Sequence, residues 1–149
     1  MKYPSPPASP CCDVEHACIF SKAILARSAS CELARRECVG EEMVLACGSP
    51  AARERCATLS ALLHERTRSA LRLPPPGRPL IHVHALRLQC SGLAALQQLV
   101  PGPDVHRMVH GAQQRHGSLA ELPWGPLVAA AASWQPGRRG GRLPAASPE

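Results

Sequence analysis

Aromatic residues are scarce in this chain, and their scarcity limits the folds that it can form. Tyr3, Phe20, Trp124 and Trp134 are the only four aromatic residues among 149. A hydrophobic core must therefore be built from Leu, Ala, Val and Cys, a set that favours closely packed helices over a β-sandwich. The composition predicts an all-α protein, a single small helical bundle of five or six helices.

Proline, glycine and serine divide the chain into segments with the hydrophobic spacing of helices. The clearest boundary is the run Cys47-Gly48-Ser49-Pro50, where glycine ends one helix, serine caps the next and proline suits its first position. The helix that it opens should be long and should stop at Pro74. The same criteria predict further helices at 13–27, at 31–46 with a stop or break at Gly40, and at 80–99, 104–117 and 127–134.

The two ends of the chain differ in composition from its middle. Residues 1–10 contain four prolines and no hydrophobic pattern, and residues 137–149 are rich in Gly, Arg and Pro. Such segments cannot bury enough apolar surface to offset the entropy of ordering. We therefore predict a disordered arm at 1–10, a helical cysteine-rich domain at 11–136 and a disordered basic tail at 137–149.

The first residues predict where the protein works. The N-terminus lacks the apolar core of a signal peptide, and no stretch approaches the roughly 18 apolar residues of a membrane span. We expect a cytoplasmic protein. In that reducing compartment cysteines serve as metal ligands, reactive thiols or core residues more often than as disulfides. The chain has eight of them: Cys11, Cys12, Cys18, Cys31, Cys38, Cys47, Cys56 and Cys90.

The basic net charge is a weak indication of a partner. The formal charge is +6, and only two of the 17 basic residues, Lys2 and Lys22, are lysines. An excess of Arg, Ala and Pro over Lys is typical of a GC-rich bacterial genome, and net charge alone does not specify a polyanion. We expect a solvated basic face and no nucleic-acid partner.

The spacing of the cysteines excludes a site built from one helix. Two cysteines seven residues apart on a helix, such as Cys31 and Cys38, lie about 10.5 Å apart along its axis. A disulfide needs Cα atoms within roughly 7 Å, and thiolates bind one zinc ion at about 2.3 Å. Any site must therefore combine cysteines from different helices and turns.

Four cysteines are the preferred ligands on these grounds. Cys47 lies at a helix end where free backbone amides stabilise thiolate charge, and Cys56 lies about two turns into the next helix. Cys90 precedes Ser91-Gly92, where small residues allow a cofactor to approach the backbone. Cys31 starts its predicted helix. The preferred set is Cys31, Cys47, Cys56 and Cys90, with Cys11, Cys12, Cys18 and Cys38 as secondary candidates, the first three of which stand near His16 and could form a second site.

Four thiolates suit an iron-sulfur cluster, [4Fe-4S] before [2Fe-2S], with zinc as the alternative metal. The sequence contains no Cys-x2-Cys, so it lacks both the bacterial ferredoxin pattern and zinc-ribbon spacing. A thiol sensor and plain buried cysteines remain open as alternatives.

The sequence predicts a non-enzymatic function. The chain has no nucleophile elbow, phosphate loop or dinucleotide-binding glycine motif. The histidine pairs His106/His110 and His82/His84 lack a well-placed carboxylate as third ligand. We therefore predict an iron-sulfur protein that serves in electron transfer, redox sensing or as an accessory subunit bound to a protein partner. Its rival is a helical interaction protein with buried cysteines or a structural zinc site.

Overall fold

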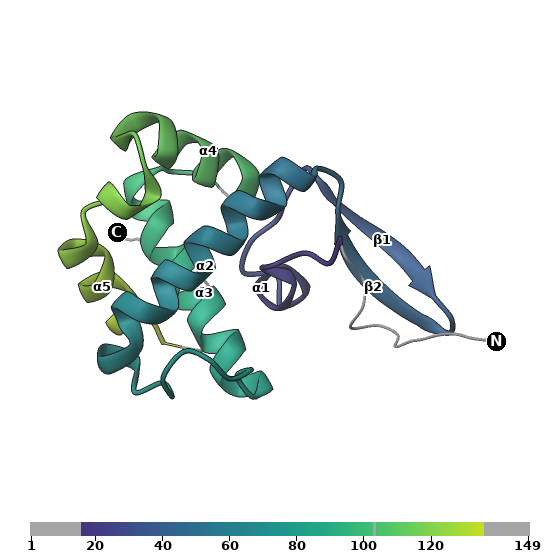
Figure 1. Cartoon of the computed structure of the whole chain (residues 1–149), viewed down its shortest axis with the longest axis horizontal. Coiled ribbons are helices and arrows are strands. Elements are labelled where there is room, and N and C mark those ends of the chain that lie inside the picture. The colour runs from purple at the N-terminus through teal and green to yellow at the C-terminus, as the bar shows by residue number, and fades with distance from the viewer. Residues whose placement is uncertain (1–15, 103, 136–149) are drawn as a thin grey trace.

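The computed structural model describes residues 16–102 and 104–135. This part of the chain is mostly helical, with five α-helices, one 3-10 helix and one two-stranded sheet (Figure 1). The elements are α1 Ser21–Leu25, β1 Ala34–Val39, β2 Glu42–Cys47, α2 Pro50–Leu71, α3 His82–Leu99, α4 Val105–His116, η2 Leu119–Glu121 and α5 Trp124–Ala132. The predicted all-α class is therefore right for most of these residues but not for the hairpin.

The helices α2 to α5 form one body, and the β1–β2 hairpin projects from it beside α1 (Figure 1). Leucines supply the centre of the core, among them Leu59 and Leu63 of α2 and Leu93 and Leu96 of α3, each at most 2% exposed. The predicted aromatic-poor core is thus confirmed. No helix of residues 16–102 and 104–135 is both long enough and apolar enough to span a membrane.

Helix α2 begins as its sequence predicts. Ser49 Oγ accepts a hydrogen bond from the Ala52 amide at 3.2 Å, and Pro50 occupies the first helical position. The helix ends when Arg72 adopts a left-handed conformation with φ of 57°, two residues before Pro74. The predicted helices in the second half are also present as α3, α4 and α5, with bounds shifted by a few residues.

Helices α2 and α3 approach each other closely at Gly92. A Cβ atom on Gly92 would lie 2.6 Å from Cδ1 of Leu63 on α2. The sequence predicts that a cofactor approaches the backbone at this small residue. In the structure it is the Leu63 side chain of α2 that approaches the backbone of α3 there.

The predicted helix at 31–46 is wrong, because this segment forms an antiparallel hairpin. Its strands pair from Ala34 opposite Cys47 to Val39 opposite Glu42. Gly40 has φ of +65°, which glycine adopts without the steric cost that other residues incur. Arg, Glu, Ala and Leu favour helices in isolation, so the composition of these strands predicts a helix. Pairing between the strands and the tight turn at Gly40 produce a hairpin instead.

The predicted helix at 13–27 is much shorter in the structure. Among its described residues, 16–27, α1, Ser21–Leu25, is the only helix, and residues 16–18 pair with β2 instead. Ala17 forms an antiparallel bridge with Ala46, and the Cys18 amide donates to the Leu45 carbonyl at 2.9 Å. Strand-like pairing with β2 thus replaces the first turns of the expected helix. The predicted start of this helix at residue 13 and the predicted arms at 1–10 and 137–149 lie outside the described residues.

Candidate functional site

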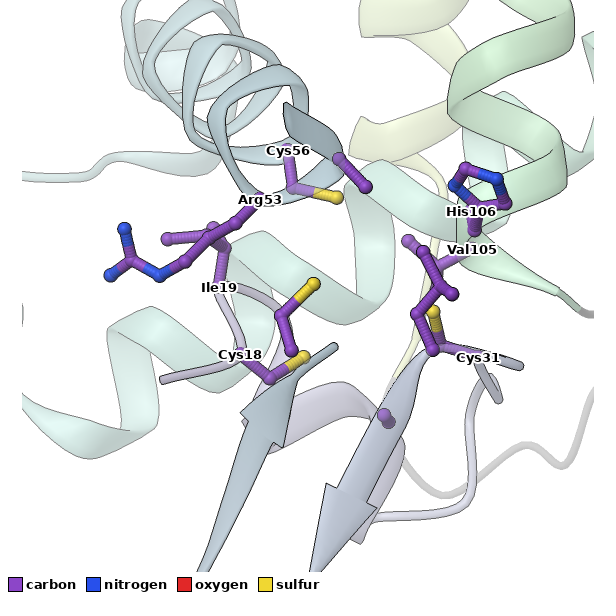
Figure 2. A pocket seen from close by; sticks show the side chains of 11 residues that line it. Cys18, Ile19, Cys31, Arg53, Cys56, Val105 and His106 are labelled. Atoms are coloured by element: carbon purple, nitrogen blue, oxygen red, sulfur yellow. The ribbon is translucent and has the colours of Figure 1, made fainter. Parts of the chain in front are cut away.

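Four cysteines from four separate segments line one pocket at the junction of the hairpin and the helical body. They are Cys18, Cys31, Cys47 and Cys56. Figure 2 shows Cys56 on α2 above the pocket, with Cys18 and Cys31 below it, near the bases of the strands. Apolar side chains complete much of the wall, together with Arg53 of α2 and His106 of α4.

The strand pairing fixes the relation between Cys18 and Cys47. Because Ala17 is opposite Ala46, Cys18 and Cys47 are diagonal neighbours on the same face of the pairing. The Cα atoms of such neighbours lie about 7–8 Å apart. A disulfide requires roughly 7 Å or less, so these thiols suit a shared ligand better than a direct bond.

The loop that carries Cys31 is tied to the start of α4. The Val105 amide donates to the Ser30 carbonyl at 2.7 Å. The Asp104 carboxylate accepts hydrogen bonds from the Glu32 amide and, at 2.9 Å, from the Arg107 amide. One residue therefore caps α4 and holds the neighbour of Cys31 in place.

Burial in the pocket raises the pKa of the Cys18, Cys31 and Cys56 thiols. Burial is the main cause, and the other pocket cysteines a smaller one, of the rise in the pKa of Cys56 to about 12 and in that of Cys18 to about 11. Burial also raises the pKa of Cys31. As free thiols these groups are therefore protonated at neutral pH, and thiolates here need a positive partner.

Several features around the pocket favour negative charge on the sulfur atoms. The backbone at Phe20 acts to lower the pKa of the Cys18 thiol, and the backbone at Leu33 and His106 acts to lower that of the Cys31 thiol, because nearby amide groups stabilise a thiolate. The first turns of α2 and α4 also reach the pocket, and helix N-termini carry partial positive charge. Amide hydrogen bonds to sulfur and a positive electrostatic environment are typical of metal-thiolate sites.

The enclosed space is small. The cavity volume is about 10 Å³, roughly the space that one water molecule requires. Within residues 16–102 and 104–135, no three His, Cys, Asp or Glu side chains already form a metal-binding group. The four cysteines line one pocket, but their sulfur atoms must turn or move to coordinate a common ligand.

The structure brings together three of the four preferred cysteines and places the fourth elsewhere. Cys90 is buried in the core within α3 and does not line the pocket; its burial raises its pKa. Cys18, a secondary candidate in the sequence, lies in the pocket where Cys90 was expected. Cys38 is exposed on β1, and Cys11 and Cys12 lie outside the described residues.

Sequence reasoning missed Cys18 as a full member, and it also missed Arg53 and His106. The pairing of Ala17 with Ala46 brings Cys18 to the pocket. No local sequence motif predicts that pairing. His106 stacks on His110 with ring centroids 6.0 Å apart, and its Nε2 lies 3.9 Å from a Glu32 oxygen. The carboxylate near this histidine pair thus comes from the loop beside Cys31.

Comparisons of the chain with protein-family models, with curated proteins and with solved structures each gave no match. The four-cysteine pocket is therefore the feature of the molecule that points to a function.

Proposed function

We propose that this protein binds an iron-sulfur cluster through Cys18, Cys31, Cys47 and Cys56. The observation that carries the proposal is the convergence of these four cysteines on one pocket at the N-terminal ends of two helices. Four cysteine thiolates are the ordinary ligand set of [4Fe-4S] and [2Fe-2S] clusters. This set differs from the sequence-based one by taking Cys18 in place of Cys90.

The backbone geometry is compatible with a cluster. Diagonal neighbours such as Cys18 and Cys47 have Cα atoms about 7–8 Å apart, and a cluster presents separate iron atoms to separate thiolates. The backbone amides that act to lower the pKa of Cys18 and Cys31 would also stabilise the sulfurs of a bound cluster.

A structural zinc site is the second candidate, and the volume of the pocket favours it. A space of about 10 Å³ suits one atom, whereas a cluster requires the four side chains to move outward. Four thiolates bind zinc tetrahedrally with Zn–S distances of about 2.3 Å. Such a site would fasten the hairpin to the helical body.

The cluster would serve electron transfer, redox sensing or an accessory role within a complex. No independent catalytic motif accompanies it in the sequence. A protein partner is part of the proposal, because a redox centre of this kind exchanges electrons with another protein.

Anaerobic purification tests the proposal directly. We expect stoichiometric iron, acid-labile sulfide and a visible absorption band that bleaches on reduction. Stoichiometric zinc without iron would overturn the cluster and support the structural site. A colourless protein that contains neither metal would overturn both and favour the helical interaction protein with buried cysteines.

Single Cys→Ser variants test the ligand set. Serine at Cys18, Cys31, Cys47 or Cys56 should remove most of the bound metal and lower the melting temperature, because a ligand bound only by the folded state stabilises that state. C38S is the matched control, because Cys38 is exposed on the hairpin. C90S should keep its metal, although it loses a buried core side chain. Loss of metal in C90S but not in C18S would contradict the assignment.

A further inference from the structure

The turn of the β1–β2 hairpin is acidic. Residues 37–43, which we call the hairpin tip, include the exposed glutamates Glu37, Glu41 and Glu42 and no Arg or Lys. Within the part of the chain that the structure describes, none of these three glutamates forms an ion pair. The side chain of Met43 beside them is 57% exposed. The hairpin tip is therefore a negatively charged surface that also displays an apolar side chain.

The chain around the end of α2 and the start of α3 has the opposite charge. No Asp or Glu occurs from residue 66 to residue 103, a stretch that carries the five arginines Arg66, Arg68, Arg72, Arg78 and Arg87. Two of them, Arg72 and Arg78, are exposed in residues 72–81, which we call the α2–α3 loop, and form no ion pair with any described residue. Ile81 and Val83 are 63% and 60% exposed. The α2–α3 loop is therefore a basic surface with apolar side chains at its end.

The α2–α3 loop is held in place at both ends. The Leu73 amide donates to the Arg68 carbonyl at 2.9 Å, and Leu73 is buried. His64 Nε2 lies 2.8 Å from the Pro74 carbonyl oxygen, and Leu80 packs against the core. Four prolines restrict the backbone between these anchors. Little conformational entropy is therefore lost when a partner contacts the loop.

The two surfaces lie at opposite ends of α2. Two residues, Gly48 and Ser49, join the hairpin to the start of this helix, and the α2–α3 loop follows its end. Helix α2 has 22 residues, so at about 1.5 Å per residue it is roughly 33 Å long. Figure 1 shows the hairpin projecting from the helical body at the start of α2. Contact between the two surfaces must therefore join two molecules.

We propose that this protein self-associates head to tail, with the hairpin tip of one molecule bound to the α2–α3 loop of the next. The tip glutamates face the loop arginines, and Met43 packs on Ile81 and Val83. Of the four large hydrophobic side chains that are exposed among the described residues, these are three. Each contact leaves one tip and one loop free, so the assembly grows as an open chain or closes into a ring. The proposal does not depend on a bound metal.

The assembly is weak and sensitive to salt. The hairpin tip is small beside the roughly 800 Å² that each partner buries in a standard interface. The net charge of +6 repels molecules from one another, so the attraction comes from the local arrangement of charge and is screened by salt.

Sedimentation velocity of the full chain tests self-association. Reductant in the buffer excludes disulfides through the exposed Cys38. We expect an average mass that increases with protein concentration at low ionic strength and falls to that of the monomer at about 1 M salt, where charges act over about 3 Å. A monomer at every concentration in low salt, or association that salt does not weaken, would overturn the proposal.

Neutral variants test each surface. E41Q/E42Q and R72Q/R78Q should each weaken association about tenfold, because each loses two exposed ion pairs. E54Q/E121Q is the matched control: it changes the net charge as E41Q/E42Q does, from exposed positions outside both surfaces, and should associate nearly as the unmodified protein does. Equal association in E41Q/E42Q and this control would overturn the role of the tip. If R72Q/R78Q does not fold, R78Q alone takes its place.

A mixture of the two neutral variants tests the head-to-tail arrangement. E41Q/E42Q keeps an intact loop and R72Q/R78Q keeps an intact tip, so the equimolar mixture should form heterodimers more readily than either variant forms homodimers. Larger assemblies should be absent, because each pair has only one intact contact. A mixture that associates no more than the separate variants, beside an unmodified protein that associates, would overturn the arrangement and indicate that like surfaces pair.

Discussion

At the scale of single residues, burial separates the cysteines by reactivity. The pKa of Cys56 is raised to about 12 by burial, whereas Cys38 is exposed on β1. Only the thiolate reacts with alkylating agents. At pH 8, a pKa of about 12 lowers the thiolate fraction roughly a thousandfold from that of a thiol of ordinary pKa near 9.

We therefore predict slow alkylation of Cys56 in folded protein from which metal has been removed. Iodoacetamide at pH 8, followed by peptide mass spectrometry, should label Cys38 long before Cys56. The rate at Cys56 should increase about tenfold for each pH unit. Denatured protein is the control, because all its thiols are exposed and should react at similar rates. Equal rates for Cys38 and Cys56 in the folded protein would contradict the burial of Cys56.

The residue types in the sequence indicated the chemistry of the site but not its full membership. Cys47 and Cys56 could be predicted because local signals, the Ser49 cap and the Pro50 start, fix their places relative to α2. Cys18 could not, because a bridge between residues 29 positions apart in sequence brings it to the pocket. Such non-local pairing leaves no periodic pattern in the segment that it positions.

At the scale of elements, the start of α4 connects helix capping to the pocket. Asp104 accepts the Arg107 amide at 2.9 Å and also the amide of Glu32, next to Cys31. Replacing Asp104 with alanine should cost about 0.5–2 kcal/mol of stability through the lost cap. It should also lower metal occupancy, because the loop that carries Cys31 loses its attachment.

Ser118→Ala is the matched control for Asp104→Ala. Ser118 accepts the Ala120 amide at 3.2 Å at the start of η2, and it does not line the pocket. Denaturant unfolding and metal analysis should show a loss of stability in both variants but a loss of metal only in D104A. Equal metal content in the two variants would show that Asp104 acts only as a cap.

The elements differ in how far their sequences determine them. Helix α2 carries its own start, and Arg72 in the left-handed conformation ends it shortly before Pro74, so its prediction was confirmed. The hairpin consists of residues such as Arg35, Arg36 and Glu37, whose intrinsic preference is helical. Pairing between β1 and β2 overrides that preference. Gly40 is the one local signal of the turn, and in the sequence a glycine there is equally typical of a helix stop.

At the scale of the whole molecule, the four-cysteine pocket joins the projecting hairpin to the helical body. The bridge of Ala17 to Ala46 and the hydrogen bond from Arg53 to Ala17 connect the two parts on one side. The link from Ser30 to Val105 connects them on the other. A metal bound by the four cysteines would add a cross-link between these connections, so its effect should appear in global stability.

The raised thiol pKa values predict opposite pH trends for the metal-depleted protein and for metal binding. The pKa values of Cys18 and Cys56 increase from 9.0 to about 11 and about 12. Between the unfolded and folded values the native state binds more protons than the unfolded state, so the free energy of unfolding falls as pH rises. The stability that the protonated thiols contribute is present below pH 9 and is lost toward pH 11 and above.

Metal binding should respond to pH in the other direction. Coordination requires thiolates and releases their protons, so affinity increases with pH where the thiols are protonated. Zinc serves as a convenient metal for the measurement: competition with a chromophoric chelator between pH 6.5 and 8.5 should show tighter binding at each higher pH. C18S should show a shallower dependence, because one fewer proton is released. Since both trends arise from the same buried thiols, an affinity independent of pH, beside a metal-depleted protein that loses stability above pH 9, would mean that the metal binds elsewhere.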